Sequence, residues 1–211
     1  MESKQESDLE IWNCFRDGDD LSLSLIYSMY AKSLYRYGLK FTDDQNVVED
    51  VIHDLFVNLI QNRRTIGETS NIQFYLLKSF RRKLVRQLKG EIRYCNDLSK
   101  EAAFEVHYSA ETEFILEETR DIRSKRLNEA VQQLSPRQKE AIYLKFQKEL
   151  NYDEISEILD MGTEACRNLI YRAIKSLREL YSQYRDLPVL LLILQRDCKF
   201  VNSFLSRPPF C

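Results

Sequence analysis

The sequence predicts an all-α protein that consists of two small helical domains joined by an acidic linker. Apolar residues recur at helical spacing along most of the chain, which favours helices that each bury one face. The chain has only five glycines and four prolines, too few for the many turns of an all-β fold. Hydrophobic residues make up 44% and charged residues 30% of it, which is typical of a soluble, mainly helical protein.

The charge and cysteine patterns exclude several classes of protein. The formal net charge is −2, so any binding of nucleic acid would depend on local basic patches. The five cysteines form no CxxC pair, and His53 and His107 stand apart from them, so we expect no metal site, no cofactor and no disulfide framework. Scattered thiols, a polar N-terminus and the lack of an apolar run of about 20 residues favour a cytoplasmic protein without a signal peptide.

The first domain is expected over residues 9–90. A short helix opens it and, after a break at Gly18, a longer helix follows that ends near Phe41. Asp19 or Asp20 can cap this longer helix. Tyrosine and aliphatic side chains at helical spacing are expected to supply its packing surface: Leu21, Leu25, Ile26, Tyr27, Met29, Tyr30, Leu34, Tyr35 and Tyr37.

A third helix is predicted from a Thr-Asp-Asp cap at residues 42–44 to about Asn62. Its inner face is made by Val47, Val48, Val51, Ile52, Leu55, Phe56 and Leu59. The opposite face is polar, with one apolar residue among its members: Asn46, Asp50, His53, Asp54, Val57 and Gln61. Such a face is typical of a docking surface for a protein partner, although a face that is simply solvated has the same composition.

Residues 63–71 form a loop by composition, and a helix over residues 72–89 follows that Ser70 or Asn71 can cap. One side of this helix is apolar and the other is basic, with no acidic residue before Glu91. Because unbalanced like charges destabilise a helix, the basic side favours an anionic ligand. The nucleic-acid contacts expected in this domain are Arg63, Arg64, Lys78, Arg82, Lys83 and Arg86.

Acidic residues dominate the stretch 91–123, which we expect to be a linker with a helical end. Helical periodicity returns over the second domain, residues 124–181. Within it Ser135 and Pro136 start a helix in the favoured order of N-cap and first helical residue. Residues 182–211 form a tail that fits neither domain, and its sequence assigns it no role.

The second domain ends in two helices separated by a tight turn, the arrangement of a helix-turn-helix. Asn151 can cap the shorter helix and Thr163 the longer, with Gly162 at the bend. The longer helix has one apolar stripe: Cys166, Leu169, Ile170, Ala173, Leu177 and Leu180. Its other side suits base edges and phosphates, and its candidates are Thr163, Arg167, Asn168, Tyr171, Arg172 and Lys175. On spacing alone, an ordinary helical hairpin fits this stretch equally well.

Two motifs carry a resemblance to a known family. Residues 49–56, EDVIHDLF, resemble the EDIVQEVF helix of bacterial sigma factors. Residues 134–141, LSPRQKEA, and residues 152–159, YDEISEIL, resemble their LPPRQREA…YEEIAEIL region. Both motifs, in this order across an acidic linker, are similar to the layout of the extracytoplasmic-function (ECF) sigma factors over roughly residues 9–181.

The resemblance implies that the chain is a transcription initiation factor that binds core RNA polymerase and directs it to specific promoters. Its acidic face would dock on the clamp helices of the β′ subunit, with the β subunit as a further contact. The residues implied in polymerase binding are Asp50, His53, Asp54 and Val57. A membrane-bound anti-sigma factor is a candidate further partner in this family.

For promoter DNA, the resemblance assigns a different element to each domain. The loop over residues 63–71 and the basic helix after it would recognise and open the minus-ten element, with Phe74 or Tyr75 near unstacked bases. The helix over residues 163–180 would read the minus-thirty-five element in the major groove. Leu169 replaces an arginine that is frequent in the family, so the promoter sequence does not transfer.

Two other functions fit the residues. A self-sufficient helix-turn-helix transcriptional regulator would bind its operator tightly without polymerase, whereas a helical adaptor would bind no DNA at all. The unbalanced basic helix argues against the adaptor. An enzyme is not expected, because the sequence has no Gly-rich phosphate loop, metal-ligand spacing or plausible catalytic set.

Overall fold

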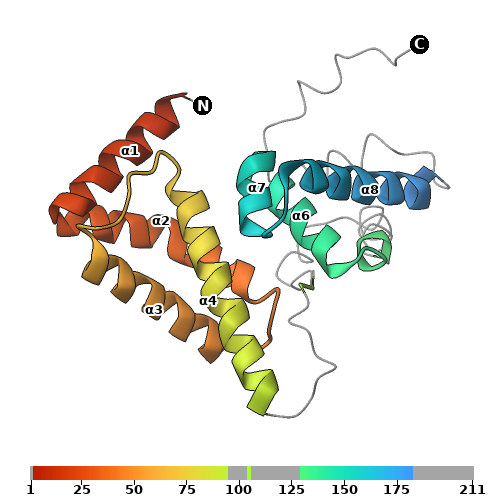
Figure 1. Cartoon of the computed structure of the whole chain (residues 1–211), viewed down its shortest axis with the longest axis horizontal. Coiled ribbons are helices and arrows are strands. Elements are labelled where there is room, and N and C mark those ends of the chain that lie inside the picture. Colours follow the sequence, from red (N-terminus) through yellow and green to blue (C-terminus); the bar gives the residue numbers. More distant parts are fainter. Residues whose placement is uncertain (1, 95–103, 106–128, 183–211) are drawn as a thin grey trace, which may run out of the picture. The chain divides into compact units, whose positions relative to one another are not determined.

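The computed structural model describes residues 2–94, 104–105 and 129–182, and these ranges contain helices and no strand (Figure 1). The all-α prediction is therefore confirmed. The chain divides into two compact units, Met1–Ala103 and Phe104–Cys211, and each is described by itself. Among the described residues, no helix combines the length and the apolar character that crossing a bilayer requires.

Unit 1 is a helical bundle whose α2 packs against the three other helices. The helices are α1 (Glu2–Asp17), α2 (Asp20–Gly38), α3 (Gln45–Asn62) and α4 (Ile72–Tyr94). Two helices are longer than predicted. Helix α1 begins before residue 9, and α4 continues past Lys89. Polar residues such as Glu, Lys and Gln have good helix propensity but leave no apolar signal in the sequence, which explains the extension of α1.

Side-chain caps determine where these helices begin. Asp19 accepts the backbone N–H groups of Leu21 and Ser22 at the start of α2, and hydrogen bonds from Ser22 lower the pKa of the Asp19 carboxyl. Asp44 caps α3 in the same way. Asn71 accepts a hydrogen bond of 3.0 Å from the backbone N–H of the third residue of α4. Of the alternatives that the sequence leaves open, the structure thus selects Asp19, Asp44 and Asn71.

The core of unit 1 contains one close approach of backbone to side chain. An added Cβ at Gly38 would stand 2.6 Å from a methyl of Val48 and 2.9 Å from the ring of Phe80, so α2 meets α3 and α4 where only glycine fits. The core of unit 1 is filled by large buried side chains: Trp12, Phe15, Ile26, Tyr30, Leu34, Tyr37, Val48, Leu55, Leu76, Phe80 and Leu84.

The predicted packing surface of α2 is partly wrong. Ile26, Tyr30, Leu34 and Tyr37 are buried as expected, but four other members are exposed: Leu21 80%, Tyr27 52%, Met29 46% and Leu25 43%. The helix is apolar on more than one side, and periodicity alone cannot tell which side meets the bundle. The residues of α2 that face the core are spaced by four: Ser22, Ile26, Tyr30 and Leu34. With the helix rotated in this way, the side of α2 that carries Leu21 faces the surface.

Unit 2 contains α6 (Pro136–Phe146), α7 (Tyr152–Ile158) and α8 (Thr163–Ser182), and residues 129–132 are also helical. Ser135 and Asn151 cap α6 and α7, as the sequence predicts, and in the structure each cap is part of a reciprocal capping box. Phe104, from the predicted linker, is buried with its ring centroid 5.5 Å from that of Tyr143. Two predicted bounds are wrong, because residues 91–94 of the predicted linker belong to α4 and Ser182 of the predicted tail belongs to α8. The remaining predictions for the linker, apart from Glu105, and for the tail lie outside the described residues.

The turn between α7 and α8 differs from the prediction in detail. The left-handed residue is Asp160, with φ 52°, and not Gly162. The backbone N–H of Met161 returns to the carbonyl of Ser156 at 3.0 Å, which closes the end of α7. Thr163 is the first residue of α8, and its hydroxyl donates to a carboxylate oxygen of Asp153 at 2.9 Å. Thr163 therefore joins the two helices instead of capping its own.

Gly38→Ala should lower the free energy of unfolding by about 1–3 kcal/mol, because the new methyl overpacks the meeting point of three helices. Urea denaturation followed by circular dichroism measures this change. Gly90→Ala is the matched control, since nothing lies within 4 Å of its added Cβ and the residue is inside α4. It should stabilise by about 0.5–1 kcal/mol. Equal stability of the two variants would contradict the close approach at Gly38.

Candidate nucleic-acid and partner interfaces

The outer face of α8 gathers most of the predicted DNA contacts. Burial of Cys166, Ile170 and Ala173 fixes the rotation of the helix, and burial also raises the pKa of the Cys166 thiol. The opposite side exposes five of the six predicted residues: Arg167, Asn168, Tyr171, Arg172 and Lys175. The Tyr171 side chain is 66% exposed, which is unusual for so large a ring. Thr163 does not join this face, because it is half-buried against Asp153.

Arg167 is held by residues that sequence reasoning did not single out. Its guanidinium lies 5.7 Å from the ring centroid of Tyr152 and 3.5 Å from a carboxylate oxygen of Glu164. The ammonium of Lys145 lies 4.4 Å from the centroid of the same ring and donates a hydrogen bond of 3.2 Å to the carbonyl of Leu150. Burial lowers the pKa of Lys145. The ring thus connects α6, α7 and α8 through two cation–π contacts. Their partners lie on different helices, so periodicity within one helix gives no signal of them.

The basic surface of unit 1 is less uniform than its sequence suggests. On α4, Arg82 and Arg86 are exposed, whereas Lys78 and Lys83 are half-buried. In the preceding loop Arg64 is exposed. Arg63, at the end of α3, packs against Gly18, and its guanidinium lies 4.0 Å from a carboxylate oxygen of Asp20. The structure therefore brings the α4 cations together and holds Arg63 at the turn between α1 and α2.

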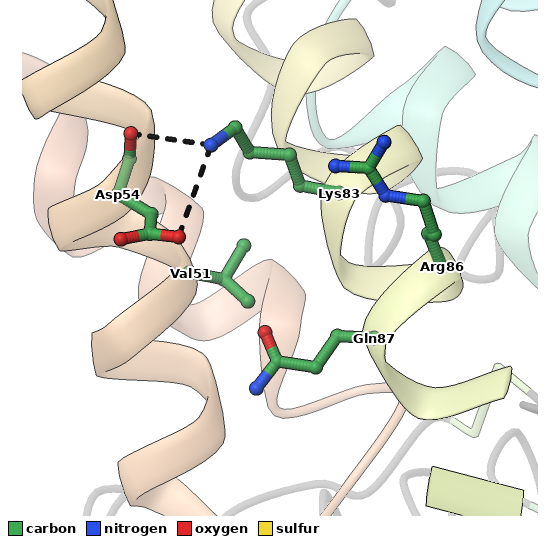
Figure 2. Close-up of a pocket in the computed structure, with 5 residues that line it drawn as sticks. All are labelled: Val51, Asp54, Lys83, Arg86 and Gln87. Atoms are coloured by element: carbon green, nitrogen blue, oxygen red, sulfur yellow. Dashed lines mark hydrogen bonds and ion pairs between the residues drawn. The ribbon is translucent and has the colours of Figure 1, made fainter. Parts of the chain in front are cut away.

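A shallow pocket of about 200 Å³ lies where α3 meets α4, lined by Val51, Asp54, Lys83, Arg86 and Gln87. Figure 2 shows the Lys83 ammonium reaching across this pocket to Asp54. It donates to the Asp54 backbone carbonyl at 3.2 Å and lies 4.0 Å from a carboxylate oxygen. The acid that balances Lys83 thus comes from α3, and the predicted partner face and the predicted DNA face meet at this pair.

The predicted partner face on α3 is open to solvent. Asp50, His53 and Asp54 are exposed and Val57 is half-exposed, so all four lie where a partner could reach them. Sequence reasoning missed two apolar neighbours. Ile60 is 44% exposed on the same helix, and the exposed Tyr27 of α2 packs edge-on against Phe56 of α3 with 4.9 Å between ring centroids.

These surfaces offer cations, amides, carboxylates and aromatic rings, which suit binding more than bond-making chemistry. Within the described ranges no group of three or more His, Cys, Asp or Glu could hold a metal ion. The cysteines there, Cys14 and Cys166, are free thiols.

Comparisons with known sequences find similarity to bacterial sigma factors. A family model described as sigma-70, region 4, matches residues 124–177. The chain is 25% identical to the ECF RNA polymerase sigma factor SigM of Bacillus subtilis (strain 168) over 166 residues, which cover 77% of this chain and 97% of that protein. It is 20% identical to the RNA polymerase sigma factor YlaC of the same organism over 78% of this chain and 95% of YlaC.

Two solved structures share the fold. One is CnrH in complex with the cytosolic domain of CnrY, with a TM-score of 0.55 and 15% identity over 84% of this chain and 99% of that one. The other is the sigma factor RpoE in complex with the anti-sigma factor NepR from Bartonella quintana. It has a TM-score of 0.53 and 19% identity over 77% of this chain and 96% of that one.

Asp54→Asn should strengthen binding of duplex DNA about two- to fivefold, because it releases the Lys83 ammonium from its carboxylate. The slope of log Kd against log salt should steepen by about 0.9, the value for one more neutralised phosphate. Fluorescence anisotropy with the full chain measures both quantities. Asp43→Asn makes the same change of net charge at an exposed bend before α3. Equal effects of the two substitutions would show that only net charge matters.

Proposed function

We propose that the chain is an ECF RNA polymerase sigma factor that binds core RNA polymerase and directs it to promoters, and that separate surfaces perform these steps. The sequence-based domain of residues 9–90, which the structure extends to the start of α1 at Glu2 and the end of α4 at Tyr94, is assigned to polymerase binding and the minus-ten element. The domain of residues 124–181, which the structure extends to Ser182, is assigned to the minus-thirty-five element. The chain between the two domains is the linker, and the tail after Ser182 receives no role.

One observation carries the proposal for unit 2. The region 4 match over residues 124–177 includes α6, α7 and most of α8, and the outer face of α8 is cationic and exposed. Arg167, Asn168, Tyr171 and Arg172 contact base edges in the major groove, and Lys175 contacts phosphate. Thr163 acts by fixing α8 on α7 through Asp153. A helix of this kind enters the major groove with its N-terminal residues against the bases.

In unit 1, the cations of α4 hold the DNA backbone near the start site. Arg82 and Arg86 contact phosphates, with Lys78 and Lys83 beside them and Arg64 in the loop. Arg63 contributes mainly by fixing the turn between α1 and α2, since its guanidinium already lies against Gly18 and Asp20. Because phosphate contacts carry no sequence information, base recognition in this unit falls to the loop over residues 63–71.

Core polymerase docks on α3. Asp50, His53 and Asp54 supply charge and hydrogen-bonding groups to the clamp helices of the β′ subunit, and Val57 supplies an apolar contact. Contact with the β subunit completes the interface. An anti-sigma factor is a further candidate partner, since the similar RpoE structure is a complex with the anti-sigma factor NepR. The protein acts in the cytoplasm, where polymerase is, and performs no catalysis of its own.

A self-sufficient helix-turn-helix regulator is not favoured. Such a regulator would be expected to resemble sigma factors only in its DNA-binding unit, whereas the similarity to SigM extends over 77% of this chain. The match to CnrH likewise includes both units, with 84% of this chain covered.

In vitro transcription with core polymerase of the source organism tests the function. Genomic fragments are transcribed with polymerase alone and with both proteins, and discrete start sites should appear only when both are present. DNA binding by the chain alone, without core-dependent initiation, would instead support the regulator.

Arg167→Ala should lower discrimination between promoters that differ at one base pair of the minus-thirty-five element. The loss should be about five- to 150-fold, because a bidentate contact contributes ~1–3 kcal/mol to discrimination. Arg86→Ala should weaken all promoters about equally and reduce the salt slope by about 0.9. Competitive transcription from paired templates measures the first effect and binding at several salt concentrations the second. A uniform loss with Arg167→Ala would contradict the placement of the reading face.

A further inference from the structure

Helix α1 holds the loop between α3 and α4 through side chains that are far from it in sequence. The indole N–H of Trp12 donates a hydrogen bond of 2.9 Å to the carbonyl of Gly67. The guanidinium of Arg16 lies 3.3 Å from a carboxylate oxygen of Glu68. Figure 1 shows this loop running beside α1 on its way from the end of α3 to the start of α4. Two successive loop residues are thus bound to one helix.

A third contact lies where the loop ends. Asp8 is only 4% exposed, and its carboxylate accepts the backbone N–H of Ile72, the first residue of α4, at 3.2 Å. The same carboxylate accepts the hydroxyl of Tyr30 at 3.4 Å. The pKa of the Tyr30 hydroxyl is raised mainly by burial and secondly by the nearby carboxylate of Asp8. A buried acid at a helix N-terminus satisfies an N–H group that would otherwise have no partner.

These contacts have little freedom to move. Trp12 is 0% exposed, and its ring centroid lies 5.5 Å from Phe15 and 4.9 Å from Tyr75, so the indole cannot turn without opening the core. Asp8, Trp12 and Arg16 are spaced by four residues, which places them on one face of α1. A rigid helix therefore fixes the loop in addition to the hydrogen bonds within the loop itself, such as Thr69 with Asn71.

We propose that Asp8, Trp12 and Arg16 are positioning residues for promoter opening: they hold the loop over residues 63–71 in the conformation that engages the unpaired minus-ten strand. This inference rests on the role of the loop in the proposed function. Ordering a loop before binding increases affinity, because the cost of ordering is then met during folding. Promoter opening depends most on an ordered loop, because a transiently unstacked base must be captured before it pairs again. In this proposal the three residues act through the loop and not through contacts of their own with DNA.

The test is made with holoenzyme on a promoter found by the transcription experiment, with 2-aminopurine in the minus-ten element to report unstacking. Trp12→Phe keeps a buried ring and removes the indole N–H. It should lower the rate of promoter opening about two- to tenfold, the range for one hydrogen bond. Affinity for core polymerase should stay within about twofold, because α3 does not depend on this bond. Ile26→Val, in the core of α2, is a control for loss of stability and should leave opening unchanged.

The Arg16–Glu68 pair gives a second test that does not depend on the tryptophan. Arg16→Glu and Glu68→Arg should each slow opening about twofold or more, and the double exchange should restore it. Normal opening by both Trp12→Phe and the single charge variants would overturn the inference, as would parallel loss of core binding and opening. Failure of the unmodified holoenzyme to open any promoter would overturn the proposed function itself, so the two failures are distinguishable.

Discussion

The rotation of each helix about its own axis is the constraint on which both surfaces depend. In α8 the buried Ile170 and Ala173 turn Arg167 outward, and in α4 the buried Phe80 and Leu84 do the same for Arg82. Burial of one aliphatic or aromatic side chain stabilises by about 1.5–3 kcal/mol. Repulsion between like charges one turn apart costs only about 0.2–0.5 kcal/mol. The apolar stripe therefore decides the orientation, and cations collect on the outside of a protein whose net charge is −2.

Local chemistry made much of this arrangement predictable. The N-caps Ser135 and Asn151 could be predicted, because a cap and the backbone N–H groups that it binds lie within three residues of each other. The two faces of α8 are equally visible, because its apolar residues follow one stripe. In α2 the same method failed, since Leu21 and Leu25 extend the apolar character to the surface. Periodicity identifies a face only where one side is clearly polar.

Contacts between elements could not be predicted. Trp12 and Gly67 lie 55 residues apart and Lys83 and Asp54 lie 29 apart, so no spacing rule connects them. The exposed Arg82 and Arg86 were recognised as basic, but the acid that balances Lys83 comes from a different helix. Composition thus indicates which groups are present in unit 1, whereas tertiary packing decides which of them stay available to DNA or to polymerase.

The ring of Tyr152 bears on how such a protein can change over evolution. It packs with the half-buried Lys145 and with Arg167, so a residue of the proposed reading face is also part of the packing between α6, α7 and α8. In the proposed role, a change at position 167 would alter base preference and unit stability together, whereas Asn168 and Tyr171 are exposed and can vary with less effect on stability. New promoter preferences should therefore arise more readily at positions 168 and 171 than at position 167.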